Sequence, residues 1–171
     1  MQYLLLALAV LAIGTLPVRA DAAMTVPLLE KIVQAVDPEA EITPNAMALT
    51  IEDIPVIVVH DAANDRMRAM TAIRSADNIP ADELMRMMQA NFDAALDARY
   101  AVAQGRLWSV FIHPLGDLNK DEFLSGLGQV VNLALTYGSS YTSGALTFGG
   151  GDSNELHRAL IDKLLKKGED I

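Results

Sequence analysis

The sequence contains no cysteine among its 171 residues. Disulfide bonds, thiol chemistry and attachment of a lipid to a cysteine are therefore excluded. A domain of more than about 100 residues can bury an adequate core without disulfide bonds. The absence of cysteine is therefore compatible with an exported protein.

Basic residues are scarce as well. The 13 Lys and Arg residues stand against 22 Asp and Glu residues, which gives a net charge of −9. A surface of this sign repels the phosphate backbone of nucleic acids and the headgroups of anionic lipids. We therefore expect neither nucleic acid nor an anionic membrane surface as a partner.

The N-terminal apolar block, residues 4–13, is shorter than the roughly 20 residues that cross a bilayer. Gly14 and Pro17 follow it, and Val18-Arg19-Ala20 places small residues three and one positions before a cut after Ala20. This pattern predicts a cleavable signal peptide at residues 1–20, and hence a periplasmic or secreted protein without a stable membrane anchor. Because no Lys or Arg precedes the block, an uncleaved anchor or a buried N-terminal helix stays an alternative.

No catalytic or metal-binding signature is present. His60, His113 and His157 are far apart in the sequence and lack the paired spacing of zinc ligands. The segment Asp117–Asp121 begins like a calcium loop but lacks the glycine and the glutamate needed at its sixth and twelfth positions. The serines of residues 139–143 form no Gly-x-Ser-x-Gly elbow. We therefore expect no enzyme activity, no cofactor and no metal.

Apolar periodicity predicts an α+β domain over residues 21–138. Helical spacing occurs at residues 25–36, 80–95 and 119–137, and strand patterns occur at residues 47–51, 55–59, 66–74, 99–104 and 107–113. The order α-β-β-β-α-β-β-α, with short turns between consecutive strands, predicts a five-stranded antiparallel sheet with helices packed on it.

Two shorter signals refine this outline. Asn119 and Glu122 form a capping box at the start of the helix over residues 119–137. Residues 139–151 are rich in Gly and Ser and predict a linker, after which Asp152 and Glu155 would cap a C-terminal amphipathic helix over residues 152–168.

The predicted hairpin carries the clearest stretch, from Asp97 to Ile112, with a tight turn near Gly105 and Leu107-Trp108 in the second strand. The capped helix from Asn119 to Tyr137 follows it. This arrangement, with the element order from Val26 to Tyr137, resembles the type III secretion chaperone superfamily, including its YbjN-like relatives. The resemblance implies an α/β sandwich that binds other polypeptides and often forms a homodimer, and it transfers no catalytic residue. Secretion chaperones work in the cytoplasm, whereas residues 1–20 predict export.

Two groups of side chains are the candidate partner-binding residues. Arg66, Arg68 and Arg74 fall on one face of a predicted strand, where they would bind carboxylates of a partner or pair with the protein's own acids. Met85 and Met88 belong to a methionine-rich helix, and methionine is common both on adaptable binding surfaces and in ordinary cores.

These features favour an exported, non-enzymatic protein-interaction module of the bacterial envelope. A periplasmic small-molecule or envelope-ligand binding protein is the alternative, with its pocket between sheet and helix.

Overall fold

The computed structural model describes residues 23–93, 96–138, 155–169 and 171. The predicted signal peptide, the Gly- and Ser-rich linker and the predicted cap at Asp152 lie outside these residues. No helix of the described part is long and apolar enough to cross a membrane.

The described chain folds into one antiparallel sheet with four helices. In chain order the elements are α1 Val26–Val36, β1 Glu41–Ile42, β2 Ala46–Ile51, β3 Ile54–Asp61, β4 Arg66–Ser75, α2 Ala81–Asp93, β5 Arg99–Ala103, β6 Arg106–His113, α3 Lys120–Leu135 and α4 Glu155–Gly168. The strands lie in the order β1-β2-β3-β4-β6-β5.

The sheet has six strands, so the prediction of five was wrong. The missed strand, β1, is only two residues long and pairs with Met47 and Ala48 of β2. Two residues cannot show an alternating pattern, so the sequence gives no signal for it.

Two strand connections are tight hairpins. Glu52 and Asp53 join β2 to β3, and Gln104 and Gly105 join β5 to β6, all four with positive φ. Positive φ at both central residues is the geometry of a type I′ turn, which matches the twist of paired strands. The turn expected near Gly105 is confirmed.

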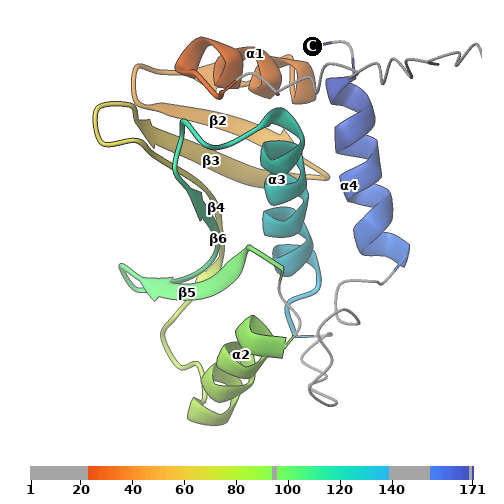
Figure 1. Ribbon diagram of the computed structural model, residues 1–171. Helices are drawn as coiled ribbons and strands as arrows, with labels where there is room; N and C mark the ends of the chain where they lie inside the picture. The colour runs from red at the N-terminus through yellow and green to blue at the C-terminus, as the bar shows by residue number, and fades with distance from the viewer. Residues whose placement is uncertain (1–22, 94–95, 139–154, 170) are drawn as a thin grey trace, which may run out of the picture.

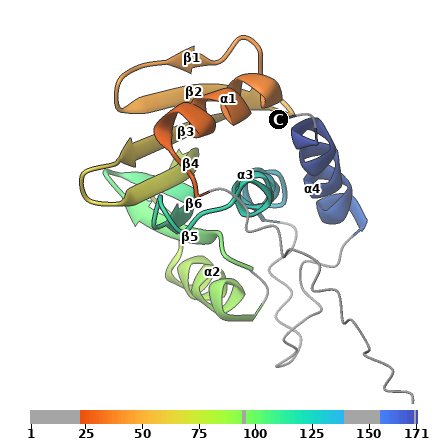
Figure 2. The same ribbon diagram turned by 45° about the horizontal axis from the view of Figure 1, so that its top comes forward.

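Helices α1, α3 and α4 all lie on one side of the sheet, and α2 lies at its end, beyond β5 (Figures 1 and 2). Thr25 caps α1 by accepting a hydrogen bond from Leu28 N, and the expected Asn119–Glu122 capping box opens α3. The main core lies between these helices and β2, β3, β4 and β6. A smaller core under α2 contains Met87, Ala90, Tyr100 and Leu107.

Helix α3 approaches the sheet closely at Gly126. A Cβ atom built on this glycine would lie 2.5 Å from the ring of Phe111 in β6. The helix is buried from Phe123 to Asn132 except at Ser125. The apolar spacing of residues 119–137 predicts Leu135 on the same buried face, but this side chain is 52% exposed. The apolar stripe of α3 therefore ends about one turn earlier than its sequence predicts.

Helix α4 packs on α3 and α1. Leu160 and Leu164 belong to the main core, and Gly128 of α3 leaves the room that the side chain of Ile161 fills. Lys163 forms an ion pair with Glu52 in the β2–β3 turn, and Lys167 donates a hydrogen bond to the carbonyl of Val36. The C-terminal helix is thus part of the domain core.

Candidate functional site

One face of the sheet carries no described helix (Figure 2). Side chains alternate along β2, β3, β4 and β6, and every second one points away from the helices. We call this surface the open face. Its apolar members, in strand order, are Ala48, Ile57, Val59, Met70, Ala72, Trp108, Val110 and Ile112. Because soluble proteins rarely leave a contiguous apolar surface bare, such a face commonly marks a binding site.

The register of the paired strands places these residues opposite one another, in rows across the sheet. Ile57 is opposite Met70, which is opposite Val110. Val59 is opposite Arg68, which is opposite Ile112, and Ile112 is 55% exposed. The rows make one continuous surface across three strands, wide enough for side chains of a partner.

Two of the three predicted arginines lie on the open face. Arg66 and Arg68 are exposed in β4, and within the described chain neither guanidinium makes a hydrogen bond or an ion pair. Asp61 is opposite Arg66, but its carboxylate accepts hydrogen bonds from the side chain and backbone of Asn64. Those bonds hold the pKa of the Asp61 carboxyl below its ordinary value. Pairing with the protein's own acids therefore does not account for these two arginines.

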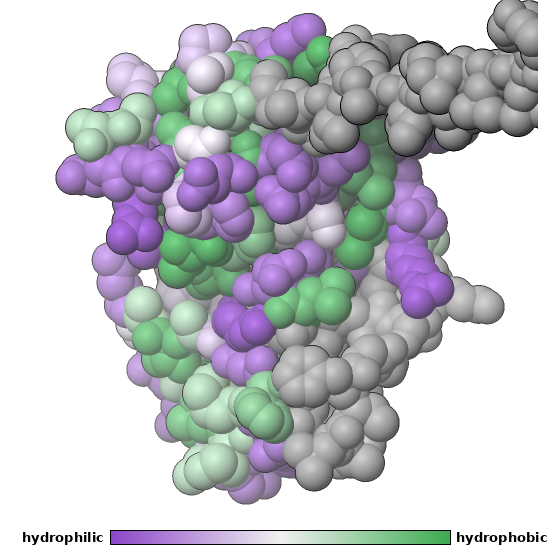
Figure 3. Space-filling view, viewed as in Figure 1, coloured by the Kyte–Doolittle hydropathy of each residue, from purple (hydrophilic) through white to green (hydrophobic). Residues whose placement is uncertain are grey.

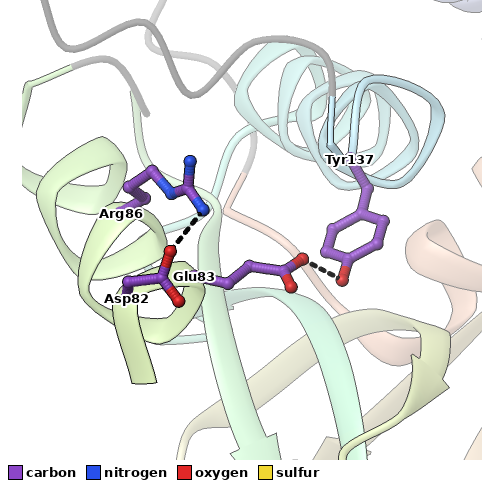
Figure 4. Close-up of polar contacts among 4 residues, drawn as sticks. All are labelled: Asp82, Glu83, Arg86 and Tyr137. Atoms are coloured by element: carbon purple, nitrogen blue, oxygen red, sulfur yellow. Dashed lines mark hydrogen bonds and ion pairs between the residues drawn. The ribbon is translucent and has the colours of Figure 1, made fainter. Parts of the chain in front are cut away.

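Arg74 does not share this face. A β-bulge between Ala72 and Arg74 inserts one residue into β4, so Arg74 lies opposite Leu107, which is buried on the helix side. Its guanidinium donates to the hydroxyl of Tyr137. That hydroxyl donates to Glu83 of α2 at 2.5 Å, as Figure 4 shows. Arg74 thus ties β4 to α2 and to the end of α3.

A hollow of about 480 Å³ lies at the β3–β4 end of the open face. Val59, Arg66, Arg68 and Ile112 are among the residues that line it. The hollow combines apolar side chains with two unpaired cations, which suits a ligand that joins apolar groups to a carboxylate.

Helix α2 exposes a second apolar surface at the other end of the sheet. Met85 is 68% and Phe92 62% exposed, Met88 lies between them, and Leu96 follows beyond the helix. Residues spaced three and four apart share one side of a helix, so Met85, Met88 and Phe92 form a stripe, which we call the α2 stripe. Figure 3 shows apolar side chains at the surface over α2.

The helical spacing of residues 84–95 groups Met88 with Met87 and Phe92 and sets Met85 apart. In the structure Met87 is buried while Met85, Met88 and Phe92 are exposed. Arg66 and Arg68 stand at the start of β4, whereas α2 follows the end of this strand, so they and the α2 stripe belong to separate surfaces. Figure 1 shows β4 and α2.

Side chains are hydrogen-bonded to several backbone groups at both edges of the sheet. At the β5 edge, the amide of Asn91 bonds both the N–H and the carbonyl of Tyr100, and Gln129 accepts from the N–H of Ala98. At the other edge, beyond the short β1, Asp37 accepts a hydrogen bond from the N–H of Thr50. A partner strand added at these positions would have to displace existing hydrogen bonds.

A second cleft, of about 550 Å³, lies between the start of β5 and the start of α3. Asp97, His113, Asp121 and Glu122 are among its lining residues. No group of three or more His, Asp or Glu side chains in the described residues is arranged to hold a metal ion. Nδ1 of His113 lies 2.8 Å from the carbonyl oxygen of Pro114, and Nε2 of His60 has no hydrogen-bond partner among the described residues. The side chain of His157 is outside the described set.

Comparison with solved structures decides the fold. The Yersinia pestis type III secretion chaperone SycH, solved in complex with a stable fragment of YscM2, superposes with a TM-score of 0.52. The alignment covers 65% of this chain and 97% of SycH, at 18% sequence identity. The chain has the type III secretion chaperone fold. The chaperone-like fold expected from the hairpin and the capped helix is thereby confirmed.

Two further complexes align more loosely with the chaperone-like chain. The ExsC–ExsE complex gives a TM-score of 0.46 at 13% identity, covering 63% of this chain and 90% of the other. The HopA1–SchA chaperone–effector complex gives 0.47 at 11% identity, covering 64% and 91%. No protein-family model and no curated protein matches the sequence.

Proposed function

We propose that this chain is a non-enzymatic, chaperone-like module that binds a protein partner through its open face. The single observation that carries the proposal is a sheet with described helices on one side only and apolar side chains on the other. The chaperone fold supports it, because SycH was itself solved with a polypeptide partner.

We place the module in the bacterial envelope, because residues 1–20 carry the pattern of a signal peptide. Mass spectrometry of the mature protein from a periplasmic fraction tests this placement. A chain that begins at Asp21 is expected, and an intact N-terminus on cytosolic material would contradict it.

The open face is tested by site-specific crosslinking in cells. A photoreactive residue in place of Ile112 is expected to form a crosslink to one defined partner protein. Ile57→Asp should abolish this crosslink, and the partner should bind the purified protein in vitro. The same crosslinker at Leu135, exposed to a similar extent on α3, is the matched control and should give no such product. Equal crosslinking from both positions would show that the open face is not the docking site.

We propose that the α2 stripe contacts a second copy of the chain. The stripe is bordered by Asp82 and Arg86, which form an ion pair at 2.9 Å (Figure 4). A two-fold contact between copies would therefore not place these residues as unpaired like charges opposite each other. The open face, with its unpaired arginines, would repel its own copy. The two surfaces therefore suit different occupants.

Replacing Met85 and Met88 with glutamate is expected to convert a dimer into a monomer, because it places four carboxylates in the two-fold contact. Size-exclusion chromatography with light scattering measures the change. Val102→Glu, at an exposed apolar residue of β5, should leave the mass unchanged. A monomeric native protein would refute the proposed dimer.

A small-molecule binding protein is the second candidate, and the hollow lined by Arg66, Arg68 and Met67 favours it. An apolar anion such as decanoate would then raise the melting temperature.

A further inference from the structure

The polar residues of the open face carry the opposite charge from the rest of the protein. Four arginines point to this side of β4, β5 and β6, against two acids in β1 and β3: Arg66, Arg68, Arg99 and Arg106 against Glu41 and Asp61. In the whole chain acids outnumber bases, 22 to 13. A cationic patch on an acidic protein attracts and orients an acidic partner while the remaining surface repels it.

Arg66 and Arg68 are the members of this patch best placed to bind. Both line the hollow, both are exposed, and both lack a partner in the described chain. Arg99 differs, because its guanidinium already donates to the carbonyls of Leu96 and Ala98. A forked guanidinium that is not otherwise engaged is suited to a carboxylate, with which it can form two parallel hydrogen bonds.

The hydrogen-bonded groups at the sheet edges limit how a partner segment can bind. Since Asn91, Gln129 and Asp37 occupy edge groups, an extended strand gains little by adding to the sheet. A segment that satisfies its own backbone hydrogen bonds, as a helix does, can instead lay side chains across the rows of the open face.

Building on the proposed function, we infer that the partner of the open face is an acidic, apolar polypeptide segment, whose carboxylates bind Arg66 and Arg68 while its apolar side chains cover Ile57, Met70 and Ile112. The segment lies across the strands, and no backbone pairing with the sheet is needed.

The sole tryptophan of the chain reports on this contact. Trp108 lies on the open face, half-buried, with its indole N–H bonded to the carbonyl of Ala103. Two tryptophan-free helical peptides of roughly 16 residues, with the same leucines but flanked by glutamates or by lysines, are titrated into the purified protein while the emission of Trp108 is followed. Decanoate forms a third arm, as a carboxylate that is not a polypeptide.

The glutamate peptide is expected to bind at least about tenfold more tightly than the lysine peptide, with the difference shrinking at high salt. Arg66→Glu with Arg68→Glu should reverse the preference, whereas Arg158→Glu, at an exposed arginine of α4, should leave it unchanged.

Four results would contradict the inference, and they separate it from the proposed function. Equal binding of the two peptides, or loss of preference in the Arg158 variant, would refute the acidic partner and leave the open face as a docking site. Binding of decanoate as tight as that of the glutamate peptide would favour the small-molecule candidate. No response of Trp108 to any probe would remove the open face as a binding site and the proposed function with it.

Discussion

Replacing Leu164 with alanine is expected to lower the free energy of unfolding by about 2–5 kcal/mol. The side chain is 2% exposed and lies in the main core, although it belongs to the last helix of the chain. Removing it leaves a cavity between α4, α3 and the β2–β3 end of the sheet. Urea denaturation followed by circular dichroism measures the loss.

Lys166→Ala, at an exposed position of the same helix, is the control and should change stability by less than about 0.5 kcal/mol. Equal, small effects of the two substitutions would mean that α4 unfolds separately from the sheet. A full effect of Leu164→Ala, in one cooperative transition, would place α4 in the same folding unit as α3.

The second large effect is expected at Gly126. Valine at this position would bring its Cβ to 2.5 Å from the ring of Phe111, which is itself buried. Forcing extra atoms into a packed core costs about 1–3 kcal/mol, and a β-branched residue in a helix adds a few tenths. We expect Gly126→Val to lower the free energy of unfolding by about 3 kcal/mol, measured by the same denaturation.

A double-mutant cycle separates the clash from helix propensity. Phe111→Leu removes the ring that the valine meets, so the double variant should be more stable than the sum of the single effects predicts. Leu135→Val, at an exposed position of α3, isolates the propensity cost of a β-branched residue. Strictly additive effects at residues 111 and 126 would contradict the close approach of α3 to β6.

The sequence predicted most elements because each carried its own local signal. The Asn119–Glu122 capping box and the tight turn at Gln104 and Gly105 both appear in the structure as expected. Such signals depend on a few neighbouring residues, so tertiary contacts do not override them. The chaperone fold followed from the order of these elements.

The site was harder to predict, because it depends on which side of a strand or helix each residue faces. One inserted residue at the β4 bulge moved Arg74 to the helix side, and no local pattern marks a bulge. On α2, methionine is apolar at every position, so composition could not tell buried Met87 from exposed Met88. The hydrogen bonds of Asn91 to Tyr100 join residues nine positions apart and needed the tertiary structure to be seen.

The hydrogen bonds at the sheet edges also affect whether copies of a protein with an exposed apolar surface associate through their sheets. Unpaired edges would let one chain extend the sheet of the next without limit, which is how fibrils grow. Because Asn91 and Asp37 are bonded to edge groups of β5 and β2, addition of a strand from another copy is hindered at those positions. An exposed apolar face can thus coexist with a lower tendency to form fibrils.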